Sequence, residues 1–404
     1  MKSKRIVSIL ICLFIALNLA ACTTKLEEPP LVIPEGYTQI DSEETAAKDP
    51  FIGFGAQMEA YWFPMNVWDL RHGYDVKDSD WDNIFLPRIQ KMKLSTVTMG
   101  ILTNMYHMGV DQYDYDTVWM RGMKRMLQDL KDSNVLVTLD LFGTTMNVQG
   151  GTGIYENAWM GRPSSTASAW LTPPLEQYED EFIEGFVDVV HYLIVEQGFT
   201  NINKLILFSE PTATFMAYGG FDYYAKLCRK IHEKLIEKGI RDRLILNLSD
   251  DAGHHDWLFN TINLLGDVAD MVNTHSYYYG YNQTNEYIQS QIETFTMGVE
   301  GTDLPIAYGE YGTLKAVGAL YAADRFDFER GVEIPRIGIN MLNAGACGAN
   351  YWILFSEFFS TDDFTISDDP DKNKIMNMGL WGFKDEEYAC RPVYYAWTLM
   401  TRYT

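Results

Sequence analysis

Positive charge is scarce in this sequence of 404 residues. Lysine and arginine number 32 against 55 aspartates and glutamates, which gives a formal net charge of −23. A surface this acidic repels phosphate groups, so the composition excludes nucleic-acid binding and electrostatic docking on anionic lipid. We therefore expect no nucleic-acid partner.

Cysteine is scarce as well. Two of the five cysteines lie within the first 22 residues, which leaves Cys228, Cys347 and Cys390. Three is an odd number and no pair has CxxC spacing, so the sequence indicates neither a disulfide framework nor a zinc cluster. No GK[ST] motif follows any expected strand, and Gly53-Phe54-Gly55 lacks a third glycine, which argues against a nucleotide-binding loop.

The N-terminus has the pattern of a secretory signal. Three positive residues within the first five precede an apolar run from Ile6 to Leu17, interrupted only by Ser8. Such a run is too short and wrongly flanked for an ordinary membrane span. The sequence thus predicts a signal peptide over residues 1–21.

The signal ends in Leu19-Ala20-Ala21-Cys22, which resembles a bacterial lipobox. The resemblance implies cleavage before Cys22 and lipidation of its thiol. The alternative is a plain signal peptide in which Cys22 has no role. We expect an exported bacterial lipoprotein, periplasmic or on the cell surface, that meets the membrane only through its N-terminal lipid.

Two regions follow the signal. Residues 22–50 hold several prolines and glutamates with few large apolar residues, as is typical of a flexible tether. The chain as a whole is 47% hydrophobic, enough for a large buried core, and we place that core in a single catalytic domain over residues 51–404.

Residues 51–404 alternate short apolar runs with helical patterns. Runs such as Leu205-Ile206-Leu207-Phe208 suit strands that are buried on both faces. The expected strands are Phe51–Glu59, Ser95–Leu102, Val135–Leu141, Lys204–Ser209, Arg243–Leu248, Met271–Tyr277, Pro305–Glu310 and Ala346–Leu354. Eight such units predict an α/β fold, a closed (β/α)8 TIM barrel, with an open doubly wound sheet as the alternative.

Two glutamates close two of these strands. Glu210 follows the fourth run and Glu310 closes the seventh. An unpaired carboxylate is costly to bury, and the strand ends of such a barrel carry its chemistry. Carboxyls about 5–5.5 Å apart there are typical of a retaining glycosidase. One would attack the sugar, and repulsion between the two would hold the other protonated near neutral pH.

The order of these motifs resembles glycoside hydrolase clan A, the (β/α)8 retaining glycosidases that include families 5, 30 and 39. Glu210-Pro211 matches the acid/base motif after strand four, and Glu310 matches the nucleophile of strand seven.

His275 and Tyr277 match a His-x-Tyr that is common at strand six, which implies that both line the substrate site and that Tyr277 hydrogen-bonds the nucleophile. The alternatives are a core histidine and a different inward-facing residue within Tyr277-Tyr278-Tyr279. The resemblance also implies that Trp352 floors the sugar site and that no cofactor or metal is required.

Some residues depart from the clan or carry only weak signals. Ser209 stands where the clan has an asparagine that holds a sugar hydroxyl, and the second strand lacks an arginine that is common there. Serine could still donate one hydrogen bond to the substrate. Glu59 and Trp62 follow the first strand and are further candidates for sugar contacts.

The long segment after the third strand, which includes Trp159 and Trp170, is expected to form a flap beside the substrate. The alternative is a surface insertion without a ligand.

Three functions remain open at this stage. The leading one is a retaining glycoside hydrolase that cleaves a β-linked oligo- or polysaccharide. The second is a non-catalytic or weakly active glycan-binding lipoprotein on the same barrel, suggested by Ser209 and the missing arginine. The third is a metal-dependent hydrolase that would use the His and Asp residues within 250–256, although such runs are more often solvated loops.

Overall fold

A computed structural model describes residues 51–58, 77–144, 147–148, 157–164, 172–281, 283–314, 328–358 and 375–403. The expected signal peptide (1–21), the tether (22–50), Cys22, Glu59, Trp62 and Trp170 lie outside these ranges. None of the described helices combines the length and apolar character needed to cross a bilayer.

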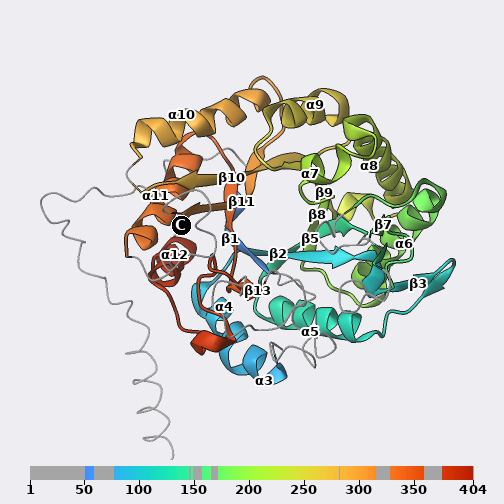
Figure 1. Ribbon diagram of the computed structural model, residues 1–404, viewed down its shortest axis with the longest axis horizontal. Coiled ribbons are helices and arrows are strands. Elements are labelled where there is room, and N and C mark those ends of the chain that lie inside the picture. Colours follow the sequence, from blue (N-terminus) through green and yellow to red (C-terminus); the bar gives the residue numbers. More distant parts are fainter. Residues whose placement is uncertain are drawn as a thin grey trace, which may run out of the picture. The chain divides into compact units, whose positions relative to one another are not determined.

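Eight parallel strands close into a barrel (Figure 1). In chain order they are β1 (Gly53–Met58), β2 (Thr96–Leu102), β5 (Leu136–Gly143), β8 (Ile202–Leu207), β9 (Ile245–Asp251), β10 (Met271–Tyr279), β11 (Ile306–Leu314) and β12 (Gly348–Tyr351). The circle closes because β1 pairs with both β2 and β12. The predicted (β/α)8 fold is confirmed, and closure excludes the open sheet.

Helices surround the barrel, and short elements extend its rim (Figure 1). The α-helices are α3 (Asp78–Asp80), α4 (Leu86–Met92), α5 (Val118–Asp132), α6 (Glu179–His191), α7 (Pro211–Phe215), α8 (Gly220–Glu237), α9 (His255–Leu265), α10 (Asn285–Thr296), α11 (Phe328–Asn343) and α12 (Pro392–Tyr403). The short strands are β3 (His107–Gly109), β4 (Gln112–Tyr113), β6 (Asn147–Val148), β7 (Pro163–Ser164), β13 (Glu357–Phe358) and β14 (Ile375–Met376).

Each barrel helix turns an apolar face inward. In α5 the side chain of Thr117 accepts a hydrogen bond from the backbone of Met120, which caps the helix. The face that repeats every three or four residues, including Met123, Leu127 and Leu130, is fully buried. One hydrophobic cluster spans the strands and the helices, so the barrel is a rigid support for the side chains at its rim.

Two strand ends differ from the expected ones, and both differences affect the glutamates. The strand expected over Lys204–Ser209 ends at Leu207 because Phe208 has a left-handed φ of 68°. The strand expected over Pro305–Glu310 continues to Leu314. Glu210 therefore lies beyond its strand, whereas Glu310 lies inside one.

Candidate active site

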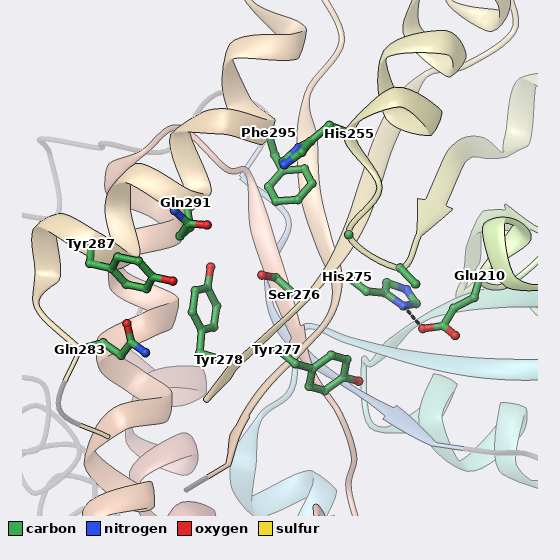
Figure 2. A pocket seen from close by; sticks show the side chains of 12 residues that line it. Glu210, His255, His275, Ser276, Tyr277, Tyr278, Gln283, Tyr287, Gln291 and Phe295 are labelled. Carbon is green, nitrogen blue, oxygen red and sulfur yellow. Dashed lines mark hydrogen bonds and ion pairs between the residues drawn. The ribbon is translucent and has the colours of Figure 1, made fainter. Parts of the chain in front are cut away.

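Glu210 is held by a sharp turn between β8 and α7. Its φ of 42° lies in the left-handed region, and it is the N-cap of α7, with Pro211 in the first turn. Its backbone N–H donates to Oδ2 of Asp250 at 3.4 Å. The side chain is 37% exposed and accepts a hydrogen bond at Oε1 from Nδ1 of His275 at 3.0 Å (Figure 2).

Glu310 approaches from another wall of the barrel. It lies on β11 directly beside His275 of β10, because the pairing of these strands shifts register between Thr274 and His275. Its side chain is only 9% exposed. The hydroxyl of Tyr277 donates to Oε2 of Glu310 at 2.7 Å, the contact that the clan resemblance implies.

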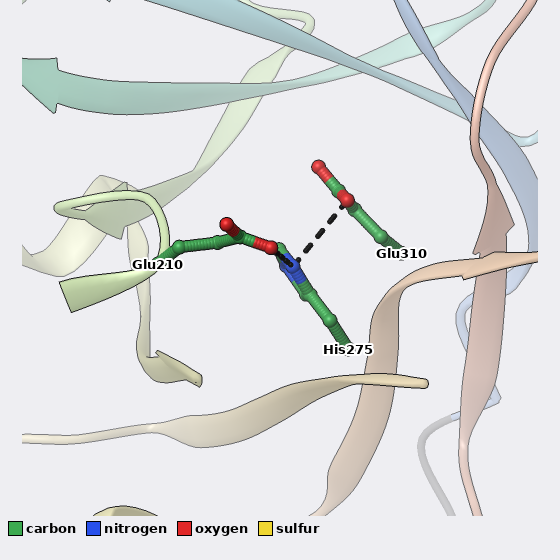
Figure 3. Close-up of side chains that lie close together, drawn as sticks. All are labelled: Glu210, His275 and Glu310. Atoms are coloured by element: carbon green, nitrogen blue, oxygen red, sulfur yellow. Dashed lines mark hydrogen bonds and ion pairs between the residues drawn. The ribbon is translucent and has the colours of Figure 1, made fainter. Parts of the chain in front are cut away.

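His275 joins the two carboxylates. Its Nδ1 lies 3.0 Å from Oε1 of Glu210 and 3.4 Å from Oε2 of Glu310 (Figure 3). The three atoms that these residues direct toward one another all lie within 4.8 Å. The two carboxyls therefore lie close enough together to act on one glycosidic bond; about 5–5.5 Å separates such groups in retaining glycosidases.

Asp250 completes the group, and the sequence did not single it out for this position. It is 1% exposed, and its Oδ1 lies 3.0 Å from Nε2 of His275. The next residue, Asp251, serves a different purpose: its carboxylate accepts from the Ser249 hydroxyl and from the His254 backbone N–H. Asp250 thus contacts His275, whereas the other His and Asp residues of the suggested metal site at 250–256 do not share this contact.

The acids around His275 favour its protonated form. Burial alone lowers its pKa, but the carboxylates of Asp250 and Glu310 and the hydrogen bonds to Asp250 and Glu210 raise the pKa well above the ordinary value. With both ring nitrogens protonated, His275 donates to Asp250 and Glu210 simultaneously. The ring balances part of the negative charge that three acids bring to the barrel rim.

The carboxyl of Glu310 has a raised pKa. Burial raises the pKa of Glu310 to about 7; Glu210 and Asp250 add to the rise, while His275 and Tyr277 oppose it. Burial thus raises the pKa of the predicted nucleophile, a rise that the sequence-based expectation did not assign. Glu310 then becomes fully anionic only above neutral pH.

Ser209 and Trp352 lie at the same barrel end. Ser209 is 4% exposed and its backbone N–H donates to the Leu141 carbonyl at 3.2 Å. Trp352 directly follows β12 and is 9% exposed. Its ring meets Tyr277 edge-on, with centroids 6.3 Å apart. Both residues are therefore near the carboxylate pair, and their contacts with substrate stay predictions.

Trp159, which was expected on a flap beside the substrate, packs against the protein itself. The indole N–H of Trp159 donates to the His107 carbonyl at 2.8 Å, and its ring packs against His107 and Tyr178. Trp159 thus fastens the β3–β4 hairpin to the start of α6.

The metal site suggested for residues 250–256 is not assembled in the described part of the chain. There, the grouped His, Cys and acidic ligands are Glu210, His275 and Glu310 instead. His255 packs on Phe295, with centroids 4.2 Å apart.

The barrel is similar to solved glycoside hydrolases. A family 39 enzyme from the gut symbiont Bacteroides cellulosilyticus matches at a TM-score of 0.56 and 12% identity, over 87% of this chain and 64% of that chain. An exo-β-1,4-mannosidase from an Opitutaceae bacterium matches at 0.57 and 14%, over 90% and 62%. A monomeric β-xylosidase from Caulobacter crescentus matches at 0.57 and 12%, over 88% and 69%.

These matches support the predicted resemblance to the barrel glycosidases at the level of fold. The chain spans about two thirds of the length of these structural relatives. No protein-family model and no curated protein matches the sequence. At 12–14% identity, this structural likeness shows the fold alone, and the chemistry must be argued from the site itself.

Proposed function

We propose that this protein is a retaining glycoside hydrolase that cleaves a β-linked oligo- or polysaccharide. The observation that carries the proposal is the convergence of Glu210 and Glu310 on one nitrogen of His275, at 3.0 and 3.4 Å. The β8–α7 turn and strand β11 bring these acids together from positions 100 residues apart in the chain. The similar barrels of known glycosidases agree with the proposal.

The reaction then proceeds in two displacements. In the first, a carboxylate oxygen of Glu310 attacks the anomeric carbon and the bond to the leaving oxygen breaks as Glu210 transfers its proton to that oxygen. In the second, Glu210 takes a proton from water, whose oxygen attacks the same carbon and releases Glu310. Both inversions together retain the configuration.

The surrounding residues prepare Glu310 for attack. A buried carboxylate is costly to ionise, and the hydrogen bond from Tyr277 and the positive charge of His275 both reduce this cost. Asp250 fixes the ring of His275 from its other nitrogen. We assign Tyr277, His275 and Asp250 as positioning residues, with Ser209 and Trp352 as substrate contacts.

A second candidate is a non-catalytic glycan-binding protein on the same barrel. The observation that favours it is Ser209, which replaces the sugar-binding asparagine of the resembling clan. Such a protein would bind oligosaccharides without cleaving them.

Aryl β-glycosides distinguish the two candidates. The wild-type chain is incubated with a panel of glucosides, xylosides, mannosides and galactosides, and aryl release is followed. Glu310→Ala should abolish turnover, whereas the exposed Glu300→Ala serves as the matched control. Turnover that survives in Glu310→Ala would refute the proposal, and binding without any turnover by the wild type would favour the second candidate.

We also propose that the protein is an exported lipoprotein anchored through Cys22. The support is the lipobox-like Leu19-Ala20-Ala21-Cys22 after a short apolar run. Metabolic labelling with radioactive palmitate in a bacterial host should mark the wild type and not Cys22→Ser. Equal labelling of the two proteins would contradict this assignment.

A further inference from the structure

Two β-bulges flank strand β10, one on each side. Toward β9, the register shifts between Asn273 and Thr274, and Asp250 is the extra residue of its strand. A bulge takes the side chains near it out of the regular alternation of a strand. The bulge on β9 therefore accounts for the way in which Asp250, rather than Asp251, reaches the ring of His275.

The second bulge lies toward β11. There the register shifts between Thr274 and His275, and Gly309 is the extra residue. A Cβ atom at Gly309 would lie 2.8 Å from Oδ1 of Asn273 and 2.9 Å from Oδ1 of Asp250. These two oxygens thus lie beside the same point of the backbone, and glycine is the residue that permits this close approach.

Asn273 has no hydrogen-bond partner for its side chain. It is 0% exposed, and neither Oδ1 nor Nδ2 of its amide is bonded to another of the described residues. Burial without a partner is costly for both atoms, so a fully buried amide in this position is expected to have one. No step of the proposed reaction involves Asn273.

Asp250 can accept a further hydrogen bond. A carboxylate offers about four lone-pair sites. Within the described ranges, Asp250 accepts from Nε2 of His275 at Oδ1 and from the backbone N–H of Glu210 at Oδ2. Its Oδ1, the oxygen that approaches Gly309 together with Asn273, is thus the oxygen that holds His275.

The amide of Asn273 can supply the missing donor. Two acceptor oxygens that face the same point repel each other. A half turn of the amide exchanges Oδ1 and Nδ2 in nearly the same space and turns an N–H group toward Asp250. This one rotation gives the buried amide a partner and gives the carboxylate a third hydrogen bond.

We propose that Asn273 is a positioning residue whose Nδ2 donates a hydrogen bond to Oδ1 of Asp250, directly or through one water, and so holds Asp250 against His275. The inference rests on the proposed glycosidase function, because His275 in turn contacts Glu210 and Glu310. Asn273 acts on these acids through Asp250 and does not itself take part in the reaction.

The ring N–H of His275 that faces Asp250 gives the direct signal. In proton NMR, a ring proton that is hydrogen-bonded to a carboxylate resonates at low field and moves upfield when the bond weakens. Asn273→Leu keeps the size of the side chain and removes the donor, so this resonance should move upfield. We also expect kcat to decrease about tenfold, with little change in KM. Asn340→Leu, which removes a similarly buried amide from α11, should change neither.

A double-mutant cycle tests whether Asn273 acts through Asp250. In the Asp250→Asn background, Asn273→Leu should lower kcat by less than about twofold more, because the carboxylate that it holds is already gone. Equal losses of kcat in both backgrounds, or a His275 resonance that does not move in Asn273→Leu, would overturn the proposal. If Asn273→Leu does not fold, the smaller Asn273→Val provides the same comparison.

The NMR signal does not depend on turnover. A wild type that cleaves no glycoside would refute the proposed function, and the His275 resonance in Asn273→Leu would still decide on the role of Asn273. An active wild type whose resonance is unchanged by Asn273→Leu would refute the role of Asn273 and leave the glycosidase function intact.

Discussion

Asp250 and Glu210 bind the two nitrogens of the same imidazole, each at 3.0 Å, so that His275 is clamped between a buried and a half-exposed carboxylate. The ring also faces Glu310 at 3.4 Å. A change at Asp250 is therefore transmitted to both acids of the pair through the charge and orientation of one side chain.

Replacement of Asp250 tests this arrangement. In Asp250→Asn the negative charge that raises the pKa of His275 is lost, so that pKa should fall and His275 should spend more time neutral near pH 7. We expect kcat/KM to decrease by a factor on the order of 10–100, the effect of weakening one hydrogen bond between charged groups. NMR titration of the His275 ring measures the shift directly. Asp256→Asn, exposed at the start of α9, is the control. An unchanged His275 titration would show that Asp250 acts only on the fold.

The sequence located most of this site because burial leaves a strong pattern. Strands buried on both faces form continuous apolar runs, and an acid within such a run, as at Glu310, stands out. Glu210 was recognisable for a similar reason, although strand β8 ends at Leu207, three residues before Glu210. The eight strands and the closed barrel followed from counting these runs.

Asp250 could not be found in the same way. The end of β9 reads Ser249-Asp250-Asp251, and the period of two would assign only one aspartate to the interior. Left-handed φ angles at Ser249 and Asp250, of 82° and 46°, break that alternation. Which acid points inward depends on the contact with His275, 25 residues later. A similar long-range contact, to His107, fixes the position of Trp159.

The pH dependence of catalysis should follow Glu310. Attack needs the anion, and the pKa of Glu310 is about 7. With a glycosyl fluoride, whose departure needs no proton from Glu210, kcat/KM should fall tenfold per pH unit below about pH 7 and level off above it. The measurement is the pH profile of fluoride release. A plateau that extends down to pH 5 would show that Glu310 is already ionised there.

Tyr277 should determine the pH below which kcat/KM falls, that is, the acidic limb of the pH profile. Its hydroxyl donates at 2.7 Å to Oε2 of Glu310 and stabilises the anion. In Tyr277→Phe the pKa of Glu310 should rise further, so the limb should move to higher pH and kcat/KM at pH 7 should decrease about tenfold. Tyr395→Phe, exposed on α12, is the matched control. A lower rate without a shift of the limb would assign Tyr277 to substrate binding alone.

Azide can test the proposed acid/base role of Glu210. Glu210→Ala should cleave aryl glycosides with good leaving groups far better than those with poor ones, because only the latter need the proton. Azide can enter the space that Glu210 vacates and attack the glycosyl-enzyme, which should give a β-glycosyl azide. In Glu310→Ala, azide replaces the nucleophile and should give the α-product. NMR of the products distinguishes these outcomes, and reversed configurations would exchange the two roles.

Ionisation of Glu310 should also lower the free energy of unfolding as the pH rises. The carboxyl keeps its proton up to about pH 7 in the folded chain but loses it near pH 4.5 when unfolded. Between these values the folded state binds more protons, so the free energy of unfolding decreases with rising pH, by at most about 3 kcal/mol. Glu310→Gln has no such proton to lose. The stability of this variant relative to the wild type should thus increase from pH 5 to pH 8 in urea unfolding, with Glu300→Gln as the exposed control. Parallel curves for Glu310→Gln and the wild type would show that burial does not perturb this carboxyl.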